Sequence, residues 1–357
     1  MKKILSLDGG GIRGIIAGTF LTYIEKKLQE LSGDENTRIA DYFDFVAGTS
    51  TGGILAAMLL APDENGRPKF TAEETLNLYL QKGYNIFNGS RRSVIARLGV
   101  VAQIRNATQY RPDYLEDLLK KYFGDMKVEE LIKPCIIPAY DIRHQRAVFF
   151  RSREKKQRQY YLRDAVRSTS AGPTYFPPKA MKNLNPLEDE KENGLHEYIN
   201  VDGGVFANNP LMCAYAECRK PETFPDRGGQ PLSVSEMIVL SIGTGSQRLP
   251  FSNVQRSSRW GLVNWARNVP TLMMNGALDT TTYQFTSVFK AGGEENMENF
   301  IRLDVPEEIQ KAQRYSSDMD DASSRNVQRL RDAGELALER AIEEQDLDGF
   351  IEKVFNN

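Results

Sequence analysis

Short apolar runs alternate with longer stretches of helically spaced apolar residues over the first sixty positions. The run Ile4–Leu7 predicts a short buried strand, and residues 12–31 carry apolar side chains at helical spacing, which predicts a helix. The same order then recurs, because the apolar run Phe43–Ala47 is followed by a tight glycine-containing turn and by the apolar stretch 53–60. A repeated strand, tight loop and helix is typical of α/β proteins. We therefore expect a three-layer fold with a central, mainly parallel sheet flanked by helices.

The rest of the chain predicts further elements of both kinds. Helices are expected over 76–87 and 112–123, and strands over 134–140, 147–150 and 237–242. The polar stretch 183–197 predicts a surface loop. From about residue 306 the periodic apolar positions predict two or three amphipathic helices. Because no linker is evident, we expect one domain over 1–335 with a helical extension, 336–357, packed on it.

Composition and charge narrow the class of protein. With 357 residues, 40% hydrophobic and 26% charged, the chain is typical of globular proteins. The net charge of −2 gives no basic field that would favour nucleic acid as a partner. Three cysteines without metal-ligand spacing fit a reducing compartment, and we expect no metal and no other cofactor. Without a secretory signal or an apolar run of roughly 20 residues, we expect a cytoplasmic protein that contacts membranes only peripherally.

The turn at residues 48–52 has the sequence Gly-Thr-Ser-Thr-Gly and lies between a predicted strand and an apolar helix. Gly48 and Gly52 permit a sharp turn that a side chain would obstruct, and Ser50 lies at its apex. A glycine-flanked turn with a structural serine is the alternative interpretation. The strand-to-helix context favours a nucleophile elbow, and so an enzyme that attacks an acyl ester.

A second glycine motif, Asp8-Gly9-Gly10-Gly11-Ile12-Arg13-Gly14, lies between the first predicted strand and helix. Backbone N–H groups of Gly9, Gly10 and Gly11, together with the helix N-terminus, suit an anion such as the oxyanion formed in acyl transfer. Arg13 adds a positive charge that could hold the loop in shape. The alternative is a phosphate-binding loop of a nucleotide-binding enzyme, although the lysine of the usual phosphate loop is absent.

A third motif, Asp202-Gly203-Gly204, follows a predicted strand that includes residues 199–201. A carboxylate at a strand end can accept a proton from a nearby hydroxyl, although Asp-Gly-Gly alone is more often a turn. A serine-histidine-aspartate triad would need His144 or His196, the two histidines of the chain, and both lie in a predicted turn or loop. The scarcity of histidine favours a Ser50–Asp202 dyad.

These three motifs, in this order, resemble those of the patatin-like phospholipases. The resemblance implies an α/β fold with Ser50 as nucleophile, Asp202 as base and Gly9, Gly10 and Gly11 as oxyanion donors. The remaining motif residues would support these groups: Arg13, Gly48, Gly52, Gly203 and Gly204. The stretch 168–178 is also similar to the family, with Thr169 and Gly172 where alanine is usual. The implied activity is hydrolysis of glycerolipid carboxylic esters with release of fatty acid.

The resemblance also suggests partners. Membrane phospholipids would be the substrate, and two stretches, 91–105 and 260–274, combine basic with apolar or aromatic residues that suit a lipid surface. Some bacterial members are activated by cyclic nucleotides in antiviral defence, and the chain length and the segment 250–300 are compatible with that group. Four arginines in or near this segment could meet phosphates: Arg248, Arg256, Arg259 and Arg267. A homodimer is a further open expectation.

Overall fold

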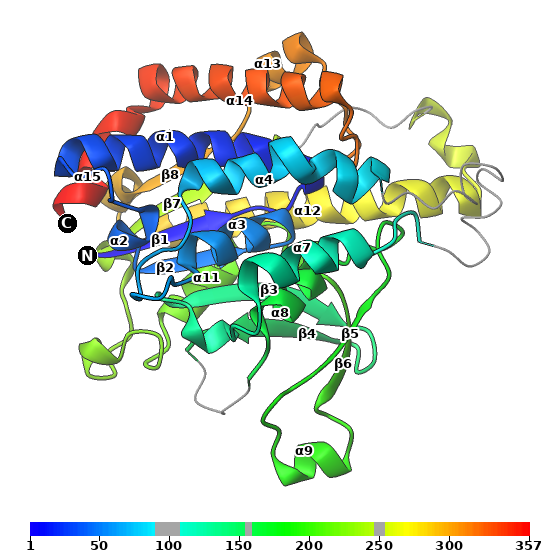
Figure 1. Ribbon diagram of the computed structural model, residues 1–357. Coiled ribbons are helices and arrows are strands. Elements are labelled where there is room, and N and C mark those ends of the chain that lie inside the picture. Colours follow the sequence, from blue (N-terminus) through cyan, green and yellow to red (C-terminus); the bar gives the residue numbers. More distant parts are fainter. Residues whose placement is uncertain (90–107, 154–158, 246–253) are drawn as a thin grey trace.

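A mixed sheet runs through the centre of the protein (Figure 1). The computed structural model describes residues 1–89, 108–153, 159–245 and 254–357, and these contain eight strands in one sheet. The order is β5-β6-β3-β2-β1-β7-β8, and β4 pairs with β3 outside this path. The strands are β1 (Lys2–Leu7), β2 (Phe45–Gly48), β3 (Cys135–Asp141), β4 (Arg146–Arg151), β5 (Lys179–Lys182), β6 (Glu197–Asp202), β7 (Met237–Ile242) and β8 (Phe300–Leu303).

The sheet is parallel over its larger part and antiparallel at one end. β1 lies parallel to both β2 and β7, and β3 and β8 extend this parallel part on either side. The pairs β3–β4, β3–β6 and β5–β6 are antiparallel. The expected mainly parallel sheet is therefore confirmed, and a block of antiparallel strands completes it beside β3.

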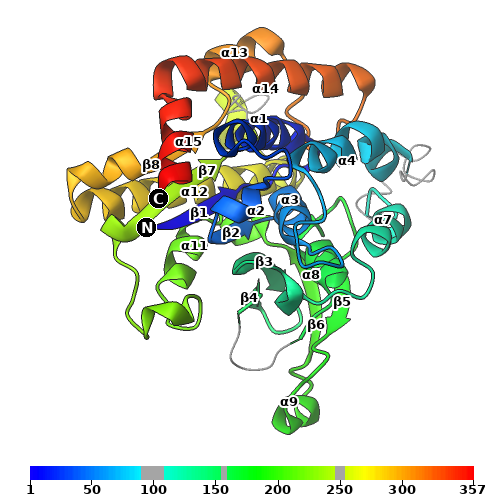
Figure 2. The same cartoon turned by 60° about the vertical axis from the view of Figure 1, so that its left-hand side comes forward.

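Helices cover both faces of the sheet. Figures 1 and 2 show α1 and α4 on one face with α14 lying across α1, and α11 and α12 on the other face. The helices on or above the first face are α1 (Gly14–Ser32), α3 (Thr51–Leu60), α4 (Ala72–Tyr84), α8 (Leu162–Thr169), α14 (Ser324–Gln345) and α15 (Leu347–Asn356). The second face carries α11 (Leu211–Cys218) and α12 (Leu262–Ala291). The other helices are α7 (Asp113–Phe123) and the short helices α2 (Ile39–Tyr42), α9 (Glu188–Glu192), α10 (Gly204–Ala207) and α13 (Glu307–Gln313).

Burial of both sheet faces explains the continuous apolar runs in the sequence. Leu5 and Leu7 belong to the core on the α1 side, whereas Ile4 belongs to the core on the α12 side. In β2 the same alternation places Val46 on the first side and Phe45 on the second. Because strands buried on both faces need apolar residues at every position, their sequence does not alternate with polar residues.

The predicted elements differ from the structure mainly at their ends. The helix expected over 76–87 begins earlier, at Ala72, because Thr71 Oγ1 accepts from the N–H of Glu74 and caps the helix. The predicted loop 183–197 contains the short helix α9. Three helices follow residue 306, and position 335 lies inside α14, so the helical extension continues a helix of the main domain. Residues 90–107, which include the whole stretch 91–105, lie outside the described residues.

Candidate active site

Strands β2 and β6 meet end to end along one edge of β3. The opposite edge of β3 is occupied by β4, which pairs with it over residues 136–141. β2 runs parallel to β3 beside Cys135 and Ile136, whereas β6 runs antiparallel and ends opposite Ala139. The carboxyl ends of β2 and β6 therefore face each other beside Pro138. A proline is tolerated in the gap because no neighbouring strand requires its missing N–H.

The turn after β2 has the backbone geometry of a nucleophile elbow. Ser50 has φ 54° and ψ −120°, a conformation that non-glycine residues rarely adopt. A Cβ built on Gly48 would lie 2.1 Å from the carbonyl oxygen of Gly52, and one built on Gly52 would lie 2.2 Å from that of Leu7. Glycine is therefore required at both positions, since backbone atoms fill the space that a side chain would need. The predicted strand-turn-helix context of Ser50 is present in β2 and α3.

Ser50 and Asp202 form a direct hydrogen bond although they are 152 residues apart in sequence. Ser50 Oγ donates to Asp202 Oδ2 over 2.6 Å, and the N–H of Gly204 donates to the other carboxylate oxygen over 2.7 Å. Burial raises the pKa of Asp202 to about 6, while the hydrogen bonds from Ser50 and Gly204 and the charge of Arg167 act in the opposite direction. The carboxylate is thus both oriented and more basic than an exposed aspartate.

Thr169 holds the backbone of the elbow. Its hydroxyl accepts a hydrogen bond from the N–H of Ser50 over 2.9 Å and donates one to the carbonyl of Pro138 over 2.5 Å. The residue is fully buried at the end of α8. Thr169 therefore links the strained serine to the gap between β2 and β6. The sequence showed Thr169 as a departure from the family's usual alanine, and only the structure assigns it this contact.

We expect Thr169→Val to lower kcat by about tenfold, because it leaves the N–H of Ser50 and the carbonyl of Pro138 without their shared partner. Valine keeps the shape of threonine, so the hydroxyl is the group that is tested. Ester hydrolysis measured beside Thr169→Ser, which keeps the hydroxyl, provides the matched control. A valine variant with wild-type kcat would show that the hydroxyl does not position Ser50.

The glycine loop lies beside Ser50. Its hydrogen bonds leave fewer N–H groups for an oxyanion than the three that the sequence predicts. The N–H of Gly9 donates to the carbonyl of Asn208 over 2.9 Å, so it does not point to an oxyanion beside Ser50. Among the described residues, no acceptor is found for the N–H groups of Gly10 and Gly11. Gly11 has φ 60°, and a Cβ there would lie 2.1 Å from the carbonyl oxygen of Met319. The backbone of Met319 thus packs against the loop and restricts its conformation.

A buried ion pair supports the start of this loop. The two terminal guanidinium nitrogens of Arg302, on β8, donate to the two carboxylate oxygens of Asp8 over 3.2 and 2.6 Å. Arg302 also donates to Ser241 on β7 over 2.6 Å and to Asp304 over 3.2 Å. Burial raises the pKa of Asp8 to about 6, and the charge of Arg302 opposes this shift. The pair fixes the residue that directly precedes Gly9.

Arg13, near the end of the glycine loop, is buried. The residue is only 6% exposed, and burial lowers the pKa of its guanidinium. Tyr315, Asp304, Tyr175 and Asp318 are the ionisable groups whose charges act on it. The role of Arg13 in shaping the loop stays a prediction from the sequence.

Each histidine has a hydrogen-bond partner other than Ser50. His144 Nδ1 lies 2.5 Å from Asp141 Oδ2 in the turn between β3 and β4. His196 Nδ1 donates to the carbonyl of Glu190 over 3.2 Å, next to α9. The observed partner of the Ser50 hydroxyl is Asp202. The arrangement matches a dyad.

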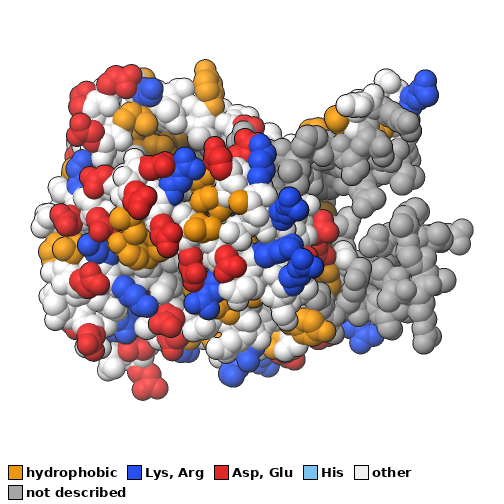
Figure 3. Space-filling model, turned by 90° about the horizontal axis from the view of Figure 1, so that it is seen from above, with side chains coloured by type: hydrophobic (Ala, Val, Ile, Leu, Met, Phe, Trp, Pro, Cys, Tyr) orange, Lys and Arg blue, Asp and Glu red, His pale blue; other side chains and the backbone are white. Residues whose placement is uncertain are grey.

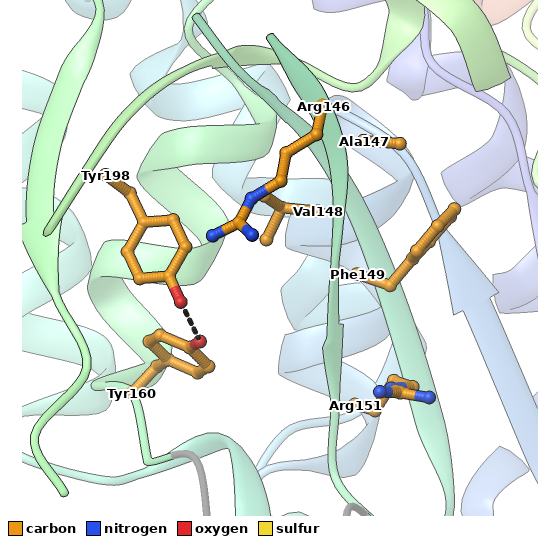
Figure 4. A pocket seen from close by; sticks show the side chains of 7 residues that line it. All are labelled: Arg146, Ala147, Val148, Phe149, Arg151, Tyr160 and Tyr198. Carbon is orange, nitrogen blue, oxygen red and sulfur yellow. Dashed lines mark hydrogen bonds between the residues drawn. The ribbon is translucent and has the colours of Figure 1, made fainter. Parts of the chain in front are cut away.

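A cavity of about 200 Å³ lies against β4, away from the dyad (Figure 4). Its lining consists of Arg146, Ala147, Val148, Phe149, Arg151, Tyr160 and Tyr198. The hydroxyl of Tyr160 donates to that of Tyr198 over 3.1 Å, which Figure 4 shows at the side of the cavity. Neither Ser50 nor Asp202 lines it. We therefore assign this cavity no role in the chemistry of the dyad.

Comparisons with known proteins agree with this geometry. A family model described as "Patatin-like phospholipase" matches residues 5–215, which include the glycine loop, the elbow and Asp202. Patatin-like protein 1 of Arabidopsis thaliana is 36% identical, with 100% of this chain and 86% of the relative covered. Patatin-08 of Solanum tuberosum is 30% identical, with 96% and 85% covered.

A solved structure, VipD from Legionella pneumophila, is 13% identical and has a TM-score of 0.33, with 95% of this chain and 66% of that chain covered. The family assignment rests on the sequence comparisons. The matched family model spans more than half of the chain, and the plant relatives align over nearly all of it. The chain belongs to the patatin-like phospholipase family and is a serine acyl hydrolase.

Proposed function

We propose that the enzyme hydrolyses carboxylic ester bonds of glycerophospholipids and releases free fatty acid through the Ser50–Asp202 dyad. Acyl hydrolysis of lipids follows from the family, and the dyad and its oxyanion donors are the proposal. One observation carries it: the 2.6 Å hydrogen bond from Ser50 Oγ, at a strained elbow, to a buried carboxylate. A nucleophile within hydrogen-bond distance of an oriented base is the arrangement that covalent acyl transfer requires.

In the acylation step Ser50 Oγ attacks the ester carbonyl carbon while Asp202 accepts the hydroxyl proton. The carbonyl oxygen becomes an oxyanion, which the N–H groups of Gly10 and Gly11 stabilise. Collapse of this intermediate breaks the bond to the alcohol oxygen. The leaving lysophospholipid takes the proton from Asp202, and the acyl group remains on Ser50.

In the deacylation step a water molecule attacks the acyl carbon and Asp202 accepts its proton. The same two N–H groups stabilise the second oxyanion. Collapse releases the fatty acid and returns the proton to Ser50 Oγ. Both steps balance without a metal or a redox partner, since each proton moves only between Asp202, Ser50, water and the leaving alcohol.

The activity is expected to depend on pH through Asp202. Only the ionised carboxylate can accept the serine proton, and burial raises its pKa to about 6. We therefore expect kcat/KM to fall about tenfold per pH unit below this value and to level off above it. The measurement is a pH profile with an ester that does not itself ionise. An inflection near the ordinary aspartate value of about 4 would show that burial does not raise the pKa of this carboxyl, and a profile without any inflection between about pH 3 and 8 would contradict its role as base.

A fluorophosphonate probe tests the nucleophile directly. The probe should label Ser50, located by mass spectrometry of the digested protein, and Asp202→Asn should slow the labelling strongly. The double variant His144→Gln and His196→Gln should be labelled at the wild-type rate, because neither histidine contacts the dyad. Labelling at another residue would reassign the nucleophile, and loss of labelling in the double variant would favour a triad.

The alternative of a nucleotide-binding loop fits the geometry less well. A phosphate loop presents several consecutive N–H groups, whereas here Gly9 donates to Asn208 and Ile12 donates to Met319 over 2.8 Å. The two remaining N–H groups suit a single oxyanion. Nucleotide hydrolysis that is unaffected by Ser50→Ala would support the alternative.

Regulation and assembly stay predictions from the sequence. Cyclic-nucleotide activation, an antiviral role and a homodimer find no support in the plant relatives, whose names mention none of them. Of the four arginines suggested for phosphate contact, Arg259 has a described side chain, and it is exposed. In the described residues no helix combines the length and apolarity of a membrane span, so the lipid contact proposed here is peripheral.

A further inference from the structure

The outward face of α12 changes character along its length. In the half toward the C-terminus this face is mostly polar, with Asp279, Thr280 and Gln284 exposed beside Tyr283, which is 74% exposed. In the half toward the N-terminus it carries Leu272, which is 47% exposed, and Met273, which is 52% exposed. Grouped exposed apolar side chains mark interaction sites more often than ordinary surface.

Trp265 extends this apolar face toward the start of α12. Its side chain is 43% exposed, and it lies seven residues, or about two helical turns, before Leu272 on the same side of the helix. The ring also contacts Trp260 edge to face, with centroids 5.2 Å apart. We call Trp265, Leu272 and Met273 the α12 apolar face.

The helix that carries the α12 apolar face also contacts the catalytic loop. Met274, directly after Met273, points to the opposite side of the helix, where its Cε would lie 3.7 Å from a Cβ built on Gly204. The N–H of Gly204 in turn donates to Asp202. Figure 1 shows this half of α12 projecting at the right, beyond α1, α3 and α4. A surface bound to the α12 apolar face would therefore lie about one helix diameter from the catalytic loop, with α12 between them.

The sequence around this face has a net positive charge. Residues 254–278 contain three arginines and no acidic residue, although the whole chain has a net charge of −2. The face seen from above in Figure 3, over α14, is different, because acidic and basic side chains are mixed there. Trp side chains with nearby basic residues are typical of segments that lie at a lipid interface.

We propose that the α12 apolar face docks on the surface of an anionic phospholipid bilayer and brings the dyad to its substrate there. This inference rests on the proposed lipid hydrolase function and adds the surface by which the enzyme meets the lipid. Trp265, Leu272 and Met273 enter the interfacial region, and the surrounding positive charge attracts anionic headgroups. Leu272 and Met273 can enter the bilayer while Met274 keeps its contact with the catalytic loop.

The test measures partitioning of the full chain to vesicles in a Ser50→Ala background, so that the lipid stays intact. The vesicles contain phosphatidylcholine with or without phosphatidylglycerol. We expect the double substitution Leu272→Asp and Met273→Asp to lower partitioning by about tenfold or more. The matched control, Leu187→Asp with Leu336→Asp, replaces two leucines that are 51% and 38% exposed elsewhere and should leave partitioning unchanged.

With Ser50 intact, the ratio of vesicle hydrolysis to monomeric-ester hydrolysis should fall by the same factor in the α12 variant and stay constant in the control. Equal partitioning of the α12 variant and wild type would overturn the docking surface while Ser50-dependent ester hydrolysis upheld the proposed function. Absence of Ser50-dependent ester hydrolysis would instead remove the proposed function. If light scattering showed that the α12 substitutions dissociate a dimer without changing partitioning, the face would be a subunit interface and the lipid proposal would fail.

Discussion

Ser50→Ala is expected to lower kcat for ester hydrolysis by about 10⁴-fold or more while the protein remains folded. The substitution removes the atom that forms the acyl-enzyme, so only the oxyanion donors and substrate binding remain. Asp202→Asn should cause a comparable loss, because an amide cannot accept the proton that Ser50 Oγ donates over 2.6 Å. The measurement is fatty-acid release from phospholipid and monoacyl substrates under identical conditions.

The two substitutions are also expected to be non-additive. Because the serine and the aspartate act as one unit, the double variant should be no less active than the worse single variant. Circular dichroism and thermal melting check that each variant is folded. Near-normal hydrolysis by either single variant would rule out the dyad, and losses that multiply in the double variant would show that the two groups act separately.

Arg302→Met is expected to destabilise the protein by about 3–5 kcal/mol, because it leaves the buried carboxylate of Asp8 without a counter-charge. The Asp8 side chain is 1% exposed and that of Arg302 is 14% exposed, so water cannot replace the lost contact. The change also removes the hydrogen bond to Ser241 that joins β8 to β7. Urea denaturation gives the free energy of unfolding directly.

Three variants complete this test. Arg302→Lys keeps the charge but loses the two-nitrogen contact with Asp8, so an intermediate loss is expected. Asp8→Asn combined with Arg302→Met should recover part of the loss, since neither charge is then buried alone. Lys311→Met breaks an exposed pair with Glu307 and should change stability little. An Arg302→Met protein as stable as wild type would mean that Asp8 is neutral in the fold.

The parts of the site that depend on local sequence could be predicted from it. The elbow at Ser50 needs glycines at fixed spacing between an apolar strand and an apolar helix, and all of these are adjacent in the chain. Asp202 could be predicted because it ends a predicted strand and is followed by two glycines. The scarcity of histidine then indicated a direct base, and the structure places Asp202 against Ser50.

The parts that depend on tertiary contacts could not be predicted. Thr169 approaches Ser50 only because α8 packs beside the gap along β3, and its sequence shows no sign of this role. Arg302 reaches Asp8 across the sheet from a strand 294 residues away in sequence. The hydrogen bond from the N–H of Gly9 to the carbonyl of Asn208 also joins residues far apart in sequence. Because of it, the proposal has two oxyanion donors, whereas the sequence predicted three.

The end-to-end meeting of β2 and β6 makes strand register a determinant of catalysis. If β6 slipped by one residue along β3, Asp202 would turn to the other side of the sheet, and a slip of two would carry it about 7 Å along the strand. Either change would separate it from Ser50 without altering any residue of the dyad. Insertions in the β5–β6 connection, which includes α9, should therefore be tolerated, whereas a single insertion within β6 should abolish activity in a protein that still folds.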